Sequence, residues 1–236
     1  MRGARPVARR LLLGLKGDRR TLALVVVVPV FITFLFGEVF ENPEFAAPAL
    51  LGVFVFLLTY VLTAVGFLRE RTAGTLERLL VSPISRNGLV VGYVIGFGYL
   101  ATIQSLVLLA SGVLFLEVTF DNGLWLFFLV ELLGAFTALG IGIVFSLFAQ
   151  NEFQVMQFMP AVISPQVIIG GAFVPVEDLP DYLEFVAYLM PITYLIDGME
   201  YVIFDSGTAD DFWVAIVALT IFTVLSIGLS ALVVRR

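Results

Sequence analysis

The sequence contains neither cysteine nor histidine. Without cysteine the chain has no thiol nucleophile and no disulfide. Without histidine it has no Ser-His or Cys-His dyad, and no metal site built on imidazole or thiolate ligands. Carboxylates remain, and they are the ligands that a hard cation prefers. These two absences therefore exclude several classes of active site before any motif is considered.

Charged residues are also scarce, at 14% of the 236 residues, whereas 60% of the residues are hydrophobic. An ordinary soluble domain is roughly 45–50% apolar and about 25% charged. A soluble protein of this size could not cover so much apolar surface. We therefore expect lipid to be the solvent for most of the chain.

Long apolar runs divide the chain into spans. The hydrocarbon core of a bilayer is crossed by roughly 20 apolar residues in a helix. Six segments meet this requirement: 21–40, 48–68, 89–116, 124–149, 153–174 and 212–234. The sequence predicts an all-α membrane protein with six transmembrane helices. It is expected to have two parts, an amphipathic cytoplasmic segment 1–20 and a six-span membrane domain 21–236.

Basic residues indicate how these spans are oriented. All 13 of them lie before the first span, between the second and third, or after the sixth, so a six-span chain places them on one side. By the positive-inside rule that side is cytoplasmic. Trp125 and Trp213 begin the fourth and sixth spans and then lie at the outer interface, where aromatic residues gather. The expectation is a multi-pass protein of the cytoplasmic membrane with both termini inside.

The opposite face carries most of the carboxylates and no basic residue. One interpretation is a vestibule for cations or for a cationic substrate. The other is adaptation of an exposed face to high salt, where screening tolerates dense like charge. The acids are spread over several loops, which favours the second interpretation.

A short patterned segment, 69–86, separates the second and third spans. Gly74 can end the helix that continues from the second span, and residues 75–82 can then form about two turns, roughly 12 Å long. Pro83 prevents continuation of that helix. Three leucines at spacings i, i+3 and i+4 share one of its faces: Leu76, Leu79 and Leu80.

A helix this short is not stable alone in water, so it must dock on something. It can lie on the membrane surface with its arginines near lipid phosphates. It can also bind a cytoplasmic partner. The periodicity by itself favours neither interpretation.

The pattern E-x-x-x-G-T-L-E-R-L-L-x-x-P resembles the cytoplasmic loop of type-2 ABC transporter permeases, which joins the second and third of six spans. The matching residues are Glu70, Gly74, Thr75, Leu76, Glu77, Arg78, Leu79, Leu80 and Pro83. In that family the loop carries a coupling helix that seats in a cleft of the ATP-binding subunit. The resemblance therefore implies an ATPase-coupling role for these residues.

Two further stretches extend the resemblance over nearly the whole chain. The N-terminal stretch with Asp18 and Pro29 resembles the family's entry into its first span. The segment after the fifth span resembles the family at these positions: Gly171, Phe173, Pro175, Leu179, Pro180, Pro191 and Tyr194. Residues 183–190 and 194–204 are expected to be short helices. The resemblance implies that segment 175–210 contains re-entrant helices that dip into the outer leaflet and gate the exit.

The resemblance implies a non-catalytic permease subunit of an exporter for drug-like, lipid or glycoconjugate substrates. The chain has no G-x-x-x-x-G-K-[ST] loop, so ATP and Mg²⁺ are expected in a partner, with no cofactor or metal bound here. The expected assembly has two permease copies, as a homodimer, and two ABC ATP-binding subunits, in contact with membrane lipid and without nucleic acid. The alternative is an ATP-independent channel or secondary transporter, which typically has internal repeats or buried charged pairs.

Two features inside the spans have open interpretations. Glu131 is a possible intramembrane polar site for a cationic substrate or a proton. Since it lies about two turns from Trp125, it could instead snorkel outward or pair with a hydroxyl. Small residues also recur every four positions in the third and fourth spans, which indicates a dimer seam or, as we favour, packing within one subunit. They are Gly88, Gly92, Gly96, Gly134, Ala138, Gly142 and Ser146.

Overall fold

A computed structural model describes residues 3–81 and 85–234, and its regular elements over these ranges are all helical. In chain order they are α1 (Ala4–Gly17), α2 (Arg19–Val39), α3 (Pro43–Thr72), α4 (Thr75–Leu80), α5 (Arg86–Phe115), α6 (Leu124–Phe148), α7 (Glu152–Ile169), the 3₁₀ helix η1 (Val176–Asp178), α8 (Asp181–Ala187), α9 (Pro191–Phe204) and α10 (Ala209–Val234). The predicted all-α class is confirmed.

Five of the described helices are long and apolar enough to cross a membrane, namely α2, α3, α5, α6 and α10. The remaining predicted span corresponds to α7, which is 18 residues long and contains Pro160 and Pro165. Its predicted end at residue 174 is wrong. The helix ends at Ile169, because the chain turns at Gly170 and at Gly171, whose φ is +96°. A positive φ is readily adopted by glycine, so Gly171 allows the chain to leave the helix early.

Capping side chains fix where three of the helices begin. Asp18 accepts a hydrogen bond from the backbone N–H of Thr21 at the start of α2. Ser85 does the same for Gly88 in α5, and Asn151 for Gln154 in α7. Such caps satisfy backbone donors that the helix itself leaves unpaired, so the short connections start the helices at defined residues.

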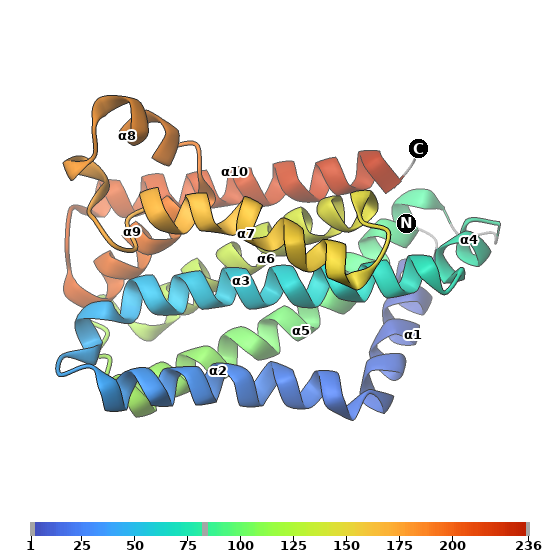
Figure 1. The fold of residues 1–236 in the computed structure, drawn as a ribbon, viewed down its shortest axis with the longest axis horizontal. Coiled ribbons are helices and arrows are strands. Elements are labelled where there is room, and N and C mark those ends of the chain that lie inside the picture. Colours follow the sequence, from blue (N-terminus) through green and yellow to red (C-terminus); the bar gives the residue numbers. More distant parts are fainter. Residues whose placement is uncertain (1–2, 82–84, 235–236) are drawn as a thin grey trace.

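The long helices lie side by side roughly along the long axis of the molecule, whereas α1 runs across it at one end, as Figure 1 shows. One end, called here the α4 end, carries α1, α4, the α6–α7 connection, the start of the chain and the end of α10. The opposite end, called here the α9 end, carries the α2–α3 and α5–α6 connections together with η1, α8 and α9. The two ends therefore collect different parts of the sequence.

Small residues let neighbouring helices approach closely. A Cβ atom on Gly142 of α6 would lie 2.9 Å from the carbonyl oxygen of Tyr60 in α3, and one on Gly134 would lie 2.6 Å from Leu195 of α9. In α5, Gly92 and Gly96 lie against α1 in the same way. Close backbone approach is the use that membrane helices make of small residues. Both stripes therefore pack within one chain, as the favoured interpretation predicts.

The segment between α7 and α10 is compactly folded. The predicted short helices are present as α8 and α9, with Pro191 at the first position of α9. On α9, Leu195, Ile196 and Met199 are almost completely buried and belong to the main hydrophobic core. This burial holds α9 firmly among the long helices at the α9 end.

Candidate functional site

The loop between α3 and α5 folds largely as its sequence predicts. Helix α3 ends at Thr72, Gly74 has a φ of +69°, and α4 follows from Thr75 to Leu80. A Cβ atom on Gly74 would meet nothing within 4 Å, so the backbone conformation rather than space requires glycine here. Pro83 and Ser82 lie outside the described residues.

The leucine face of α4 packs on the protein's own bundle. Leu76 is only 6% exposed and belongs to a hydrophobic cluster with Phe67 of α3 and Tyr93 of α5, and Leu79 packs against the same cluster. The structure does not describe the side chains of Glu77 and Leu80. The docking requirement predicted for this helix is therefore met within the chain.

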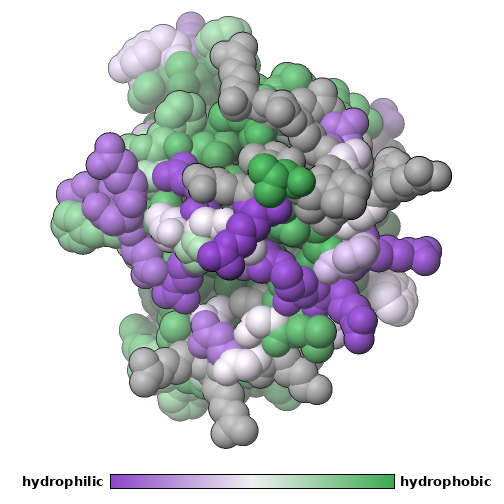
Figure 2. Space-filling model, turned by 90° about the vertical axis from the view of Figure 1, so that its right-hand side faces the viewer, coloured by the Kyte–Doolittle hydropathy of each residue, from purple (hydrophilic) through white to green (hydrophobic). Residues whose placement is uncertain are grey.

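The opposite side of α4 is open. Arg78 is exposed, and Val81, directly after the helix, is 88% exposed. Figure 2, which looks onto the α4 end, shows hydrophilic side chains across the middle of this face with hydrophobic residues above and below. A partner that binds α4 would therefore contact Arg78 and Val81. The leucines Leu76 and Leu79 would not contact that partner, because they pack α4 against the bundle.

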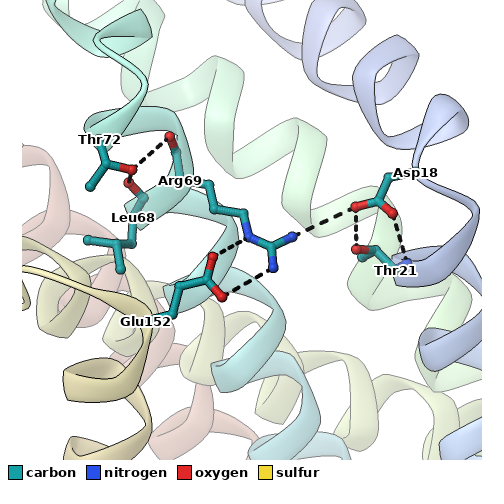
Figure 3. Close-up of polar contacts among 6 residues, drawn as sticks. All are labelled: Asp18, Thr21, Leu68, Arg69, Thr72 and Glu152. Carbon is teal, nitrogen blue, oxygen red and sulfur yellow. Dashed lines mark hydrogen bonds and ion pairs between the residues drawn. The ribbon is translucent and has the colours of Figure 1, made fainter.

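Three consecutive residues at the end of α3, called here the α3 junction, link α4 to the other helices. They are Arg69, Glu70 and Arg71. The Nε of Arg69 donates to Oε1 of Glu152 at 2.7 Å and its Nη2 to Oε2 at 3.2 Å, so this contact with the start of α7 is bidentate (Figure 3). Because Arg69 hydrogen-bonds the carboxylate, it holds the pKa of Glu152 below its ordinary value.

Arg69 also connects to the start of α2. Its Nη1 lies 3.8 Å from Oδ2 of Asp18, and that carboxylate accepts hydrogen bonds from the N–H and, at 2.6 Å, the hydroxyl of Thr21 (Figure 3). One guanidinium thus joins the ends of three helices that lie far apart in the sequence.

The other two junction residues extend the network. Glu70 accepts hydrogen bonds from Arg10 of α1 and, at 3.0 Å, from the hydroxyl of Tyr93 in α5. Arg71 donates to the carbonyl oxygens of Leu147, at 2.6 Å, and Ala149, where α6 ends. The last carbonyls of a helix lack partners within the helix, and a cation there also complements the helix dipole.

Helix geometry explains why three neighbouring residues reach so many elements. Successive residues of an α-helix are about 100° apart around its axis. The side chains at 69, 70 and 71 therefore point in three directions, toward α7 and α2, toward α1 and α5, and toward α6. The α3 junction therefore ties the end of α3, which leads into α4, to α1, α2, α5, α6 and α7 by polar contacts.

Glu70 belongs to the predicted coupling motif, but its partners were not predicted from the sequence. Arg10, Asp18 and Glu152 were not recognised as members of one network. A usable signal existed, because few carboxylates stand on the otherwise basic side of the chain: Asp18, Glu70, Glu77 and Glu152. Isolated acids among arginines indicate candidates for ion pairs.

A cavity of about 600 Å³ opens next to the α3 junction, between α1, α2, α3 and α5. Arg10, Asp18 and Arg69 contribute to its lining, and aliphatic residues of α2 and α3 form much of the rest. Gln104 of α5 also lines the cavity, and its side-chain amide donates to the hydroxyl of Thr59 in α3 at 3.3 Å. Within the described ranges, no three acidic residues gather as a metal site would require.

Glu131 lies in a different place, inside α6 toward the α9 end. It is fully buried, and neither of its carboxylate oxygens has a hydrogen-bond partner within the described part of the chain. The alternatives of snorkelling outward or bonding a hydroxyl are therefore wrong for this structure. An unpaired buried carboxyl group is costly, which keeps Glu131 a candidate intramembrane polar site.

The residues predicted for the outer segment lie at turns and helix starts. Gly171 adopts a positive φ, Pro175 precedes η1, Pro180 precedes α8 and Pro191 begins α9. Phe173 is 74% exposed. The hydroxyl of Tyr194 donates to the carbonyl oxygen of Tyr188 at 2.9 Å and so ties α9 to the end of α8. These residues shape the segment between α7 and α10, far from the α3 junction.

Comparison with known proteins adds a family context. Residues 6–204 match the family described as ABC-2 type transporter. The chain is 25% identical over 179 residues to YbhR, a probable multidrug ABC transporter permease of Escherichia coli K12. The aligned region covers 76% of this chain and 49% of YbhR. The chain is 23% identical over 210 residues to the similarly described YbhS, covering 89% and 56%. It is also 28% identical over 160 residues to the inner membrane transport permease YhhJ, covering 66% and 42%. The chain thus spans about half the length of these relatives.

Proposed function

This chain belongs to the ABC-2 type transporter family, and we propose that it is the membrane permease subunit of an ATP-driven exporter. In this proposal a separate ABC subunit binds ATP and Mg²⁺ and hydrolyses the nucleotide. Two permease copies and two ATPase subunits form the transporter. Closure of the ATPase dimer moves α4, and the long helices switch between inward-open and outward-open arrangements.

The observation that carries this proposal is the way α4 is held. Its leucines seat it on the bundle, its other side is open, and the α3 junction directly before it connects to α1, α2, α5, α6 and α7. A force on the open side of α4 is therefore passed to most of the long helices. A short surface turn with no partner would not require such connections.

The proposed orientation in the membrane is based on the basic residues of the α4 end. We place the α4 end in the cytoplasm, because all 13 basic residues fall on that side if α7 also crosses the bilayer as a sixth span. Both termini are then cytoplasmic, in a multi-pass protein of the cytoplasmic membrane. Helices α8 and α9 form the re-entrant outer segment that gates the exit.

The cargo is proposed to be drug-like, lipid or glycoconjugate. Two relatives are described as probable multidrug permeases, which favours the drug-like class for this chain. The cavity beside the α3 junction supports an amphiphilic cargo, because charged residues at the α4 end and aliphatic residues of α2 and α3 line the same space.

Co-purification from native membranes tests the proposal. The variant Arg78→Glu/Val81→Asp alters only the exposed side of α4 and is expected to lose an associated ATPase while keeping wild-type thermal stability. Asp178→Lys reverses a charge at the α9 end and serves as the control, with the ATPase retained. Bound ATPase would be measured as ATP hydrolysis and as a co-purified chain with a nucleotide-binding loop.

Two results would contradict the proposal. If no ATPase accompanies even the wild-type chain, an ATP-independent channel or secondary transporter becomes the better explanation. If the ATPase stays with Arg78→Glu/Val81→Asp, the exposed side of α4 is not the coupling surface.

A further inference from the structure

A second cavity is lined by other residues of α1 than those that line the cavity beside the α3 junction. It is a groove of about 600 Å³ between α1, the start of α2 and α5, called here the α1–α5 groove. Most of its lining is apolar and includes Leu12, Leu22 and Ile103, with Arg5 and Arg9 as its charged members. An apolar groove with two cations has the polarity of an amphiphile's binding site.

Close packing fixes the position of this groove. Val7 and Leu11 of α1 fit against Gly92 and Gly96 of α5, where a Cβ atom would lie 2.6 and 2.8 Å from those side chains. The side of α1 that carries these two residues is therefore held against α5. The groove is a defined feature of the bundle, because glycines set the distance between its two walls.

The two arginines form a compact cationic pair. Arg5 and Arg9 are one helical turn apart on α1 and both are exposed. Neither forms an ion pair within residues 3–81 and 85–234. Their neighbour Arg10, in contrast, is bound to Glu70. Arg5 and Arg9 thus keep their donors for a ligand from outside the chain.

The apolar wall runs from this cationic pair into the membrane-spanning part of α5. Ile95, Tyr99 and Ile103 follow one another at spacings of four residues, so they form one stripe about 12 Å long. Ile95 is 48% and Tyr99 56% exposed, although α5 is one of the helices apolar enough to cross a membrane. A surface of this kind in a spanning helix is one that hydrocarbon chains contact.

We propose that the α1–α5 groove binds an anionic phospholipid. Arg5 and Arg9 bind the phosphate and the negative headgroup, and an acyl chain lies along the stripe of α5. Arginine recognises phosphate through several charge-assisted hydrogen bonds, which an uncharged or purely apolar occupant would leave unmade. The ligand would brace α1 against α5 and α2, beside the network that holds α4.

Quenching by brominated lipids tests this assignment on the full chain. Trp125 and Trp213, the chain's two tryptophans, would be replaced by phenylalanine. A single reporter, Ile103→Trp, then stands in the groove. The control reporter, Ile221→Trp, stands at an exposed position of α10; both are twelve residues from the α9 end of their helix. Each protein is placed in nanodiscs of phosphatidylcholine with brominated phosphatidylglycerol or brominated phosphatidylcholine.

The groove reporter is expected to be quenched by brominated phosphatidylglycerol at about 25-fold lower mole fraction than by brominated phosphatidylcholine, since each of the two arginines at a membrane surface contributes a factor of about five. The control reporter should show no such preference. Arg5→Gln/Arg9→Gln should abolish the preference at the groove, and Arg5→Lys/Arg9→Lys should keep most of it.

Three outcomes would overturn the proposal. Equal quenching by both lipids shows no headgroup selection. A preference that survives Arg5→Gln/Arg9→Gln places the selection elsewhere. A groove reporter that neither lipid quenches shows that protein, such as a second copy of this chain, covers the groove. None of these readouts depends on an ATPase partner, so the result is separate from the fate of the exporter proposal.

Discussion

The two ends of the bundle hold their carboxylates in different ways. At the α4 end arginines bind them, as Arg69 binds Glu152 and Arg10 binds Glu70. At the α9 end neutral donors bind them instead: Thr119 to Glu44, Asn122 to Asp205 and Thr208 to Asp211. Arginine cancels the negative charge, whereas a hydroxyl or an amide leaves it in place. The α4 end is therefore a network of opposite charges and the α9 end a surface of like charges.

This difference shows that the uneven distribution of basic residues has two effects. These residues connect helices at the α4 end, and their absence from the α9 end gives the chain the charge asymmetry that orients membrane proteins. The dominant electrostatic interaction is attraction between opposite charges at the α4 end and repulsion between like charges at the α9 end. Removing a charge, changing the pH or adding salt should therefore change the stability of the two ends in opposite directions.

The largest effect is expected at Arg71. Arg71→Ala leaves the carbonyl groups of Leu147 and Ala149 without their donor, so the free energy of unfolding should fall by about 2 kcal/mol. Reversible unfolding of the full chain in detergent would measure this. Arg78→Ala, at an exposed position on the same end, is the control and should change stability by less than about 0.5 kcal/mol. Equal effects of the two variants would contradict the capping role of Arg71.

A smaller effect is expected from reversing the charge at Arg69. Arg69→Glu places a third carboxylate beside Asp18 and Glu152, and should lower the free energy of unfolding by about 1 kcal/mol, as for other exposed pairs. Adding Glu152→Arg to the same chain restores one ion pair in the opposite sense and should recover part of the loss. A double-mutant cycle measures this coupling, and purely additive effects would show that the pair contributes nothing.

Acidification should separate the two ends by the sign of their response. At the α9 end the side chain of Asp197 is still accessible to solvent, but desolvation by the surrounding protein, followed by the charges of Glu200, Glu177 and Asp211, raises the pKa of that carboxyl group to about 7. A raised pKa means that the ionised form opposes folding. Asp197→Asn should therefore be more stable than the wild type above pH 7, and this advantage should vanish as the pH falls toward the ordinary value near 4.

At the α4 end the sign is opposite. Because Arg69 lowers the pKa of Glu152, the ionised carboxylate favours the folded state. This contribution is present above the ordinary glutamate pKa of about 4.3 and is lost as the pH falls through the lowered value. Glu152→Gln should be less stable than the wild type at pH 7 and equal to it in strong acid. Unfolding curves of both variants from pH 8 to 3 measure the contrast, and shifts of the same sign would contradict it.

Salt should produce the smallest effect. Raising the ionic strength from 0.1 to 1 M shortens the Debye length from about 10 to about 3 Å. The loss caused by Glu152→Gln and the gain caused by Asp197→Asn should then both shrink, by a few tenths of a kcal/mol, because screened charges neither attract nor repel as strongly. Melting temperatures at the two salt concentrations would detect this, and an unchanged difference would assign the effects to packing.

Local features of the sequence predicted much of this fold. Long apolar runs located the helices that are apolar enough to span a bilayer, and Gly74 marked the break before α4, because a positive φ is a property of one residue. The leucine spacing predicted an amphipathic helix but did not indicate what it packs on. The early end of α7 was missed because Gly170 and Gly171 lie within an apolar run, where hydrophobicity hides a turn.

The candidate site was harder to predict, because its contacts are not local. Arg69 and Glu152 are 83 residues apart, and Arg10 and Glu70 are 60 apart. Periodicity reports only which residues share a face of one helix, so it could not identify these partners. The burial of Glu131 was missed for a related reason, since its surroundings come from other helices that fold around α6.

The separation along the chain between the α3 junction and its partners has a consequence for biosynthesis. Residues are added from the N-terminus, so when Glu70 is made Arg10 already exists, and Tyr93 follows soon after. Arg71 must wait for Leu147 and Ala149, and Arg69 for Glu152. Until then two arginines at the end of α3 have no protein partner from α6 or α7. The end that holds α4 is therefore completed late, after the first four spanning helices have left the ribosome.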